Sequence, residues 1–283
     1  MKKLIVFVFM GLLLSGCGGI EIKTPNEQTH NLKVHFLDVG QGDCILVQFP
    51  DGRNMLVDAG KNESAGRITD YLNKTGVKKL DFVVGTHPHE DHIGSLDVVL
   101  QRFQIGAVFM PKVTTNTKTF RDVLEAVKDK GLKIKTAKSG VNLVRTDSLS
   151  VDIIAPQGTA YKSLNDYSAV IKISYDQVSF LLAGDAEAFS EREVLSNSAI
   201  SPKADVLKVA HHGSRTSTSN AFLQTVAPKV ALISLGAGND YHYPHKSTLD
   251  RLKKAGIKIL RTDEKGTVVI STNGKEMNIT TEK

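Results

Sequence analysis

The stretch of sequence that decides the fold is Thr86-His87-Pro88-His89-Glu90-Asp91-His92. It holds four residues that can bind a metal ion within six positions, in a chain of 283 residues with nine histidines. An apolar segment over residues 80–84 precedes it, and a helical pattern begins at residue 95. These patterns predict a turn between a buried strand and a helix. Imidazole and carboxylate ligands suit zinc, and also manganese or iron, so a metal site is predicted at this strand end.

Three further apolar segments end in residues of the same kind. Asp185 follows residues 180–183, the pair His211-His212 follows residues 206–210, and two histidines in segment 241–245 follow residues 230–235. Because the ends of neighbouring buried strands lie at one edge of a sheet, we expect these groups to converge. A carboxylate at Asp185 can bridge two ions about 3.5–4 Å apart. The sequence therefore predicts a centre of two divalent ions, zinc or manganese.

The patterns on both sides of this stretch predict layers of strands and helices. Residues 32–57 have the pattern of three short strands joined by turns. From about residue 68, helical spacing alternates with apolar strands, and strands follow in series over residues 141–183. Three helix–strand units fill residues 187–261. Two sheets with helices outside them are the simplest arrangement, which is an α/β fold.

These motifs, in this order, resemble the metallo-β-lactamase fold superfamily, whose signature is His-x-His-x-Asp-His followed by a strand-end aspartate and a further histidine. The chain resembles more narrowly the ComEC-like hydrolase domain of DNA-uptake proteins and its stand-alone relatives, from residue 32 to about residue 269. That resemblance rests on residues 37–43, 57–60, 182–185, 208–214 and 243–245. It implies a four-layer αββα sandwich, classed as α/β or in some schemes as α+β, and a metal-dependent hydrolase.

The six expected metal ligands have different roles under this resemblance. We assign His87 and His89 to one ion, Asp91, His92 and His211 to the other, and Asp185 to both. Water between two such ions loses its proton near neutral pH, so a metal-activated hydroxide is the expected nucleophile. Most members of the superfamily supply a third histidine to the first ion, but this chain has Asn165-Asp166-Tyr167-Ser168 in that interval. Either the first ion has an open or weaker coordination, or His212 or His245 completes it.

Further residues are expected to support the ions or contact the substrate. Asp91 and His245 are the predicted catalytic residues, and His245 is expected to donate to a substrate oxyanion or to complete a metal shell. Asp58 is suited to hold a ligand histidine from behind. The other residues expected beside the site or the substrate are Asp38, Asp43, His212, Ser214 and Arg215. Asp38 and Asp43 are expected to brace the floor of the site, and Arg215 is suited to meet a phosphate.

The N-terminal residues predict export and lipid anchoring. Lys2 and Lys3 precede an apolar run over residues 4–14, which is too short to span a bilayer and is typical of a signal peptide over residues 1–16. Leu14-Ser15-Gly16-Cys17 resembles the lipobox of bacterial lipoproteins, which implies a lipid on Cys17 and a place outside the cytoplasm. A plain signal peptide or a short N-terminal anchor is the alternative. Residues 17–31 are predicted to be a tether, and residues 32–283 the hydrolase domain.

The leading functional hypothesis is hydrolysis of phosphodiesters, with DNA as the first expected substrate. The resemblance favours it, and a net charge of +6 permits a phosphate-rich partner. The alternatives are hydrolysis of another extracellular ester, such as a teichoic-acid or phosphocholine phosphodiester, a lactone or a β-lactam, or a metal-binding module that catalyses nothing. The membrane is an expected partner through Cys17, and the sequence leaves the oligomeric state open.

Overall fold

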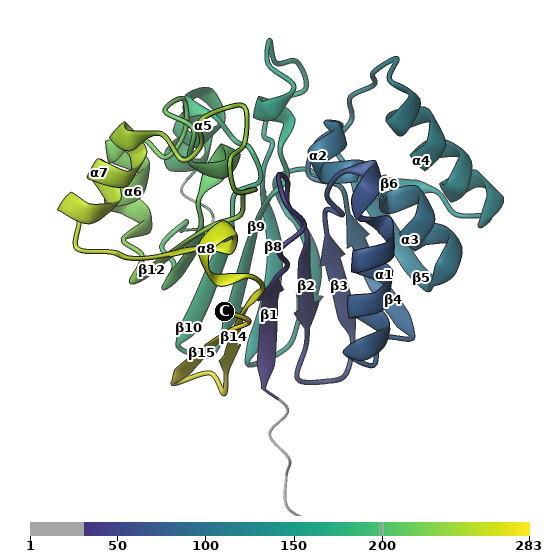
Figure 1. Ribbon diagram of the computed structural model, residues 1–283, viewed down its shortest axis with the longest axis horizontal. Helices are drawn as coiled ribbons and strands as arrows, with labels where there is room; N and C mark the ends of the chain where they lie inside the picture. The colour runs from purple at the N-terminus through teal and green to yellow at the C-terminus, as the bar shows by residue number, and fades with distance from the viewer. Residues whose placement is uncertain (1–30, 198, 200) are drawn as a thin grey trace, which may run out of the picture.

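Two β-sheets face each other, and helices cover their outer sides (Figure 1). The computed structural model describes residues 31–197, 199 and 201–283. The predicted signal peptide over residues 1–16, the predicted lipid anchor at Cys17 and residues 17–30 of the predicted tether lie outside the described residues. Within the described part of the chain, no helix has the length and apolar character needed to cross a membrane.

The first sheet has eight strands in the order β15-β14-β1-β2-β3-β4-β5-β6. Their bounds are β1 Leu32–Phe36, β2 Ile45–Gln48, β3 Asn54–Val57, β4 Lys79–Val84, β5 Gln104–Met110, β6 Ile134–Thr136, β14 Val268–Thr272 and β15 Met277–Thr281. Strands β1 to β3 pair antiparallel, which confirms the predicted opening strands. Strands β3 to β6 pair parallel, so their carboxyl ends lie along one edge.

The second sheet has seven strands in the order β13-β12-β11-β10-β9-β8-β7. Their bounds are β7 Val141–Arg145, β8 Leu149–Ala155, β9 Val170–Tyr175, β10 Val178–Leu182, β11 Val206–Lys208, β12 Val230–Ile233 and β13 Lys258–Arg261. Strands β10 to β13 pair parallel. Their carboxyl ends therefore also lie along one edge.

The helices lie in two groups on the outside of the sandwich. Those beside the first sheet are α1 Ala65–Lys74, α3 Leu96–Arg102 and α4 Lys118–Asp129, and those beside the second sheet are α5 Ala188–Ser196, α6 Asn220–Val226 and α7 Lys246–Lys254 (Figure 1). Short helical turns are α2 Glu90–Ile93, α8 Thr262–Lys265, η1 Asn62–Ser64, η2 Asn165–Tyr167 and η3 Ala210–Gly213. The hydroxyls of Thr117 and Ser219 accept backbone N–H bonds at the starts of α4 and α6, which fixes where these helices begin.

Three apolar clusters hold the four layers together. The central cluster joins side chains of the two sheets, for example Phe36 and Phe180, which are both fully buried. A second cluster packs α1, α3 and α4 on the first sheet, and a third packs α5, α6 and α7 on the second. This arrangement confirms the predicted αββα sandwich.

The C-terminal hairpin of β14 and β15 differs from the sequence-based prediction, which places no strand after residue 261. Strand β14 pairs antiparallel with β1, so a C-terminal segment completes the sheet that begins with the first described strand. Val268 and Ile270 are fully buried in the central cluster, whereas Val269 between them is partly exposed. The burial alternates over the five residues of β14, but Val269 is apolar too, so the sequence itself does not show the alternation that identifies a strand.

The contribution of β14 to the core can be tested by truncating one of its side chains. Ile270→Ala is expected to lower the free energy of unfolding by about 2–5 kcal/mol, because a fully buried side chain leaves a cavity. Urea denaturation measures the loss, and Val269→Ala on the opposite face of the same strand is the matched control, with less than half the loss. Equal losses for the two variants would contradict this placement of β14.

Candidate metal centre

The predicted ligands meet where strand ends of the two sheets face each other. In the first sheet, β3 ends before Asp58 and β4 ends before the loop that carries His87. In the second sheet, β10 ends before Asp185 and β11 ends shortly before the pair His211-His212. The expected convergence is present, because the ligand atoms of residues from both sheets lie within 4 Å of one another.

Asp185 lies at the centre of this cluster, and each of its oxygens faces two histidines. Oδ1 lies 3.2 Å from His92 Nε2 and 3.6 Å from His212 Nε2. Oδ2 lies 3.9 Å from His87 Nε2 and 3.8 Å from His211 Nε2. A carboxylate with this placement can serve two ions, one on each oxygen.

Three overlapping groups of the described residues have the spacing of metal ligands. Asp43, Asp58 and His92 form one of them, but Lys208 already pairs with Asp43 there. Of the other two, the first consists of His87, His92 and Asp185 and the second of Asp91, His92 and His212, with ligand atoms within 4.8 Å of one another in each. His89 joins the first group through its Nδ1, which lies 2.9 Å from His87 Nε2. Zinc binds nitrogen and oxygen at about 2.0–2.2 Å, so both groups are close to the size that one ion requires.

The two adjacent histidines of η3 lie differently from the sequence-based assignment, which places His211 with Asp91 and His92. The Nε2 atom that lies 3.3 Å from Asp91 Oδ2 belongs to His212. His211 instead directs Nδ1 to Glu187 Oε1 at 3.3 Å and Nε2 to the Tyr243 hydroxyl at 3.1 Å. Both histidines have positive φ angles, 51° and 50°, and this left-handed backbone decides which ring enters the buried cluster.

Asp58 holds the ring nitrogen of His92 that points away from Asp185, which is the contact predicted for Asp58. Its Oδ2 lies 2.7 Å from His92 Nδ1, and the Thr86 backbone N–H and hydroxyl donate to its two oxygens at 2.7 Å. This leaves His92 Nε2 facing Asp185. A carboxylate that holds one ring nitrogen of a ligand histidine fixes the direction of the other nitrogen.

Asp43 and Lys208 form an ion pair directly beneath the ligands. Lys208 Nζ lies 2.8 Å from Asp43 Oδ2, and both side chains are at most 1% exposed. The other oxygen of Asp43 lies 3.5 Å from His212 Nδ1, which in turn lies 2.8 Å from the carbonyl of Ser234. The pair therefore braces the ring of His212, as the sequence analysis expects of Asp43 but not of Lys208.

The loop that carries Asp43 also supports the turn that carries Asp91. The Asp43 backbone N–H donates to the carbonyl of Asp91 at 3.1 Å, and a Cβ at Gly42 would collide with that same carbonyl oxygen. Asp38, at the other end of the loop, accepts a bond from Gly40 N at 3.2 Å and lies 3.5 Å from Lys283 Nζ. Asp38 thus shapes the loop and does not face the ligand cluster.

The buried polar atoms of the cluster fit a cation. Among the described residues, His92 Nε2, His212 Nε2, Asp185 Oδ1 and Asp43 Oδ1 are buried atoms without a hydrogen-bond partner. Such atoms are costly to bury, and in native proteins they call for an ion or another partner. All four of these residues belong to groups with ligand spacing. The residues therefore fit divalent metal ions.

The electrostatics of the cluster point to the same conclusion. Burial and the neighbouring His92 lower the pKa of His87 well below its usual value, so His87 is neutral and has a free lone pair. Burial raises the pKa of Asp185, but His92 and His212 outweigh it and hold that pKa well below its usual value. Burial lowers the pKa of His92, but Asp185 and Asp58 raise it well above its usual value. A bound cation would take the place of that proton.

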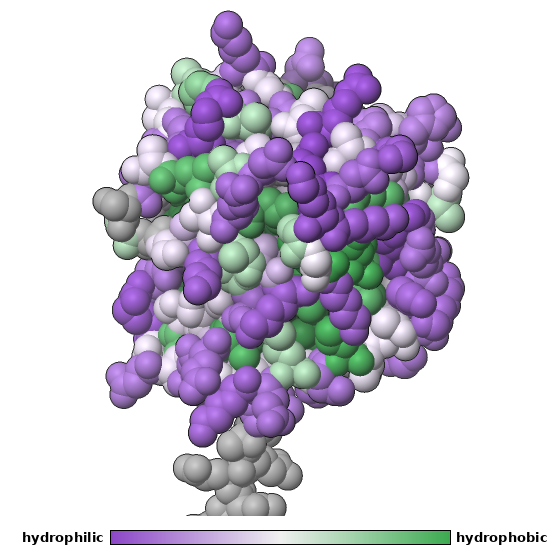
Figure 2. Space-filling view, turned by 90° about the vertical axis from the view of Figure 1, so that its left-hand side faces the viewer, coloured by the Kyte–Doolittle hydropathy of each residue, from purple (hydrophilic) through white to green (hydrophobic). Residues whose placement is uncertain are grey.

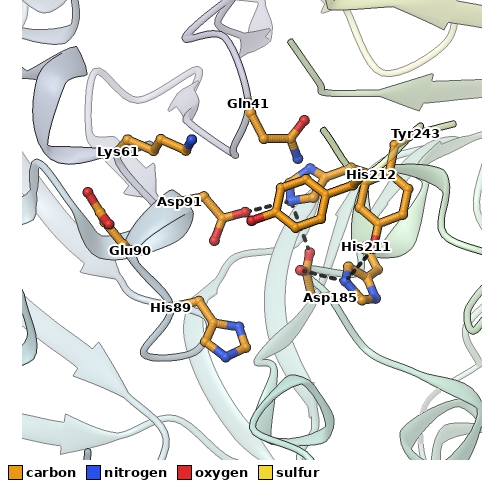
Figure 3. Close-up of a pocket in the computed structure, with 10 residues that line it drawn as sticks. Gln41, Lys61, His89, Glu90, Asp91, Asp185, His211, His212 and Tyr243 are labelled. Atoms are coloured by element: carbon orange, nitrogen blue, oxygen red, sulfur yellow. Dashed lines mark hydrogen bonds and ion pairs between the residues drawn. The ribbon is translucent and has the colours of Figure 1, made fainter. Parts of the chain in front are cut away.

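A cavity of about 350 Å³ opens onto the cluster (Figure 3). The predicted residues that line it are His89, Asp91, Asp185, His211 and His212. Five other lining residues carry no predicted role, namely Gln41, Lys61, Glu90, Tyr241 and Tyr243. Lys61 and Glu90 lie on one side of the cavity, and His211 and Tyr243 lie on the other (Figure 3). His87 and His92 are fully buried beneath it.

Three of the residues expected beside the substrate lie outside the cavity lining, namely His245, Ser214 and Arg215. His245 Nδ1 accepts the Arg215 backbone N–H at 3.0 Å, and its ring packs edge-on against Tyr243 at 5.1 Å between centroids. Ser214 is buried, and its hydroxyl lies 3.0 Å from that of Thr216. Tyr243, and not His245, lines the cavity.

The segment Asn165 to Ser168, which stands where the resemblance implies a third histidine, lies next to the first ligand group. The Ser168 hydroxyl lies 3.4 Å from His87 Nδ1 and accepts the Asp185 backbone N–H at 3.1 Å. Asn165 Nδ2 lies 3.5 Å from His211 Nδ1. These residues orient the ligands from the side and add no imidazole. His212 lies with Asp91 and His92, and His245 lies outside the cavity lining, so the open coordination of the first ion is the alternative that the geometry favours.

Comparison with known proteins identifies relatives of this chain. The family described as "Metallo-beta-lactamase superfamily" matches residues 37–237. ComE operon protein 3 of Bacillus subtilis is 33% identical over 83% of this chain and 32% of its own length. Competence protein ComA of Neisseria gonorrhoeae is 27% identical over 81% of this chain and 30% of its own length. The chain thus spans about a third of these relatives, and the ComEC-like resemblance is confirmed.

A solved structure supports the fold. The putative metal-dependent hydrolase of Parabacteroides distasonis superposes with a TM-score of 0.51 at 16% identity, over 82% of this chain and 93% of its own. The similarity therefore extends over most of the two-sheet architecture.

Metal binding by the cluster can be tested through stability. Zinc or manganese at 100 times its dissociation constant is expected to raise the free energy of unfolding by about 2.7 kcal/mol, because the ion binds the folded chain. Asp185→Asn is expected to lose most of this gain, because both ligand groups face that carboxylate. The control is Asp122→Asn, which removes a surface partner of Lys118. Urea denaturation with and without metal measures the gain, and an unchanged gain in Asp185→Asn would overturn the assignment.

The buried ion pair makes a separate prediction. Lys208→Met is expected to lower the free energy of unfolding of the metal-free protein by about 3–5 kcal/mol, because Asp43 is left buried and uncompensated. Asp43→Asn in the same background is expected to recover part of the loss. A double-mutant cycle in urea provides the measurement. A loss below about 1 kcal/mol in Lys208→Met would mean that the pair contributes little.

Proposed function

The chain belongs to the metallo-beta-lactamase superfamily, and on this premise we propose that it is a metal-dependent phosphodiesterase that cleaves DNA. The observation that carries the proposal is the buried cluster of histidines and aspartates at the floor of an open cavity with Lys61 in its wall. Relatives with competence-related names support DNA as the substrate.

The proposed cofactors are two divalent ions, zinc or manganese. His87 and His89 would hold one ion, Asp91, His92 and His212 would hold the other, and Asp185 would contact both. Divalent ions supply two kinds of chemistry at such centres: they lower the pKa of bound water and polarise phosphoryl oxygens.

The surrounding residues have distinct proposed tasks. Asp58 keeps His92 in its ligand orientation, and the Asp43–Lys208 pair does the same for His212. Lys61 points into the cavity and is suited to receive a phosphate oxygen (Figure 3). His211, with Glu187 behind it, is placed to give a proton to the leaving oxygen.

We also propose that the protein works outside the cytoplasm, attached to the membrane by a lipid on Cys17. The signal-like residues 1–16 and the lipobox-like residues 14–17 support this location. An extracytoplasmic position would bring the site into contact with DNA, or with another phosphodiester polymer, outside the cell.

Cleavage assays test the proposed activity. Protein loaded with manganese or zinc is expected to cut labelled DNA oligonucleotides. Asp91→Ala is expected to reduce kcat/KM by at least about 100-fold, because a direct ligand matters more than an outer contact. Asp58→Asn is expected to reduce it by about 10–100-fold, the usual effect of losing an outer contact. Asp122→Asn is the matched control and keeps full activity.

Two results would contradict the proposal. The first is a protein that binds less than one equivalent of metal after reconstitution, which favours a module without catalysis. The second is cleavage by Asp91→Ala at the wild-type rate, which would place the activity elsewhere or in a contaminant.

A further inference from the structure

Two tyrosines form a stacked pair at the rim of the cavity. The rings of Tyr241 and Tyr243 are nearly parallel, with an interplanar angle of 14° and 5.4 Å between centroids. Both line the cavity, and Tyr241 is 56% exposed although it is a large aromatic side chain. Exposed aromatic rings beside a polar site need an explanation, because burial would normally stabilise them.

The segment that carries the pair is held in place by local bonds. The Asn239 side-chain amide donates to the carbonyls of Gly236 and Tyr243 at 3.0 and 2.8 Å, and its oxygen accepts the Tyr243 backbone N–H at 2.9 Å. Pro244 packs so closely on Gly213 that a Cβ there would lie 2.6 Å from Pro244 Cβ. The rings are therefore presented on a pre-ordered loop, which lowers the entropic cost of binding.

The pair is joined directly to the metal centre. The Tyr243 hydroxyl lies 3.1 Å from His211 Nε2, and the same nitrogen lies 3.8 Å from Asp185 Oδ2. A group stacked on the tyrosines would thus lie beside the reacting position. The face of the protein that carries α6 and α7 is mostly hydrophilic, with small apolar areas between charged side chains (Figure 2).

We propose that Tyr241 and Tyr243 are a stacking platform for an unpaired nucleobase next to the scissile phosphodiester, so that the site takes single-stranded nucleic acid. This inference rests on the proposed phosphodiesterase function and adds its substrate class. Every base has a face that stacks on an aromatic ring, so the platform tolerates any sequence. Bases inside a duplex are stacked on each other, which leaves no free face for a protein ring.

The other walls of the cavity suit the rest of a nucleotide. Lys61 lies on the far side from Tyr243 and offers a positive charge to the backbone (Figure 3). The cavity volume of about 350 Å³ fits a small part of one strand. A double helix, whose major groove alone is about 12 Å wide, is far too large to enter.

The test compares three labelled DNA substrates of one sequence: a single strand, the same strand with a tetrahydrofuran abasic residue beside the cut, and the duplex. The wild type is expected to cut the intact single strand with the highest kcat/KM. Tyr241→Ala is expected to lower that value by about 5- to 150-fold, the effect of losing one stacked base, and to leave the abasic strand unchanged. Tyr241→Phe is expected to retain the activity, because a phenyl ring also stacks.

The control is Phe189→Ala, which removes an aromatic side chain that is 49% exposed on α5 and does not line the cavity. Two results would contradict the stacking platform without contradicting the phosphodiesterase activity. One is an equal loss of kcat/KM for the intact and the abasic strand in Tyr241→Ala. The other is a duplex that the wild type cuts as fast as the single strand.

Equilibrium binding separates this inference from the proposed function. Fluorescence anisotropy of the same strands is measured in EDTA, where no metal-dependent cleavage occurs. Weaker binding of the intact strand by Tyr241→Ala, with no change for the abasic strand, supports the platform even if no DNA is cut. Unchanged binding in the variant, or no binding by the wild type, rejects it. Failure of cleavage alone, with metal bound, rejects the proposed activity.

Discussion

The structure depends on one electrostatic constraint, which is the burial of three carboxylates at the junction of the two sheets. Asp43, Asp58 and Asp185 are each at most 2% exposed. Burial of an ionised carboxylate is costly unless a positive group lies beside it. Lys208 compensates Asp43, and His92 lies against both Asp58 and Asp185. The unpaired ligand atoms lie beside these carboxylates, so a divalent cation bound there would compensate the remaining negative charge.

This constraint explains why the site needs two sheets. A single sheet edge would present its ligands in a row, whereas facing sheets surround an ion from two directions. Asp58 and His92 come from the first sheet, and Asp185 and His212 come from the second. The 3.2 Å contact of Asp185 with His92 and the 3.3 Å contact of His212 with Asp91 cross the junction. A metal ion bound there would therefore hold the two halves of the sandwich together, and stability and metal binding are linked.

The sequence predicts the sandwich and most of the residues that meet in the cluster, because each signal is local. His87 to His92 lie in one turn, and Asp185 directly follows an apolar strand. The choice between His211 and His212 could not be made in this way, since it depends on two left-handed backbone conformations that no spacing reveals. Lys208 was not predicted either, because a lysine is expected at the surface unless its partner is known. The β14–β15 hairpin was missed since its partner, β1, lies more than 230 residues earlier.

The floor and the rim of the cavity tolerate substitution to different degrees. The floor consists of buried side chains at strand ends, and each of them contacts at least one other ligand, so almost any substitution there disturbs the whole cluster. The rim consists of Gln41, Lys61 and Tyr241, which come from loops and contact solvent. Loop side chains can change without cost to the core. The floor therefore determines the class of reaction, and the rim determines which substrate reaches it. A stacked tyrosine pair on an ordered loop is the kind of rim feature that selects a flat aromatic group over an aliphatic ester.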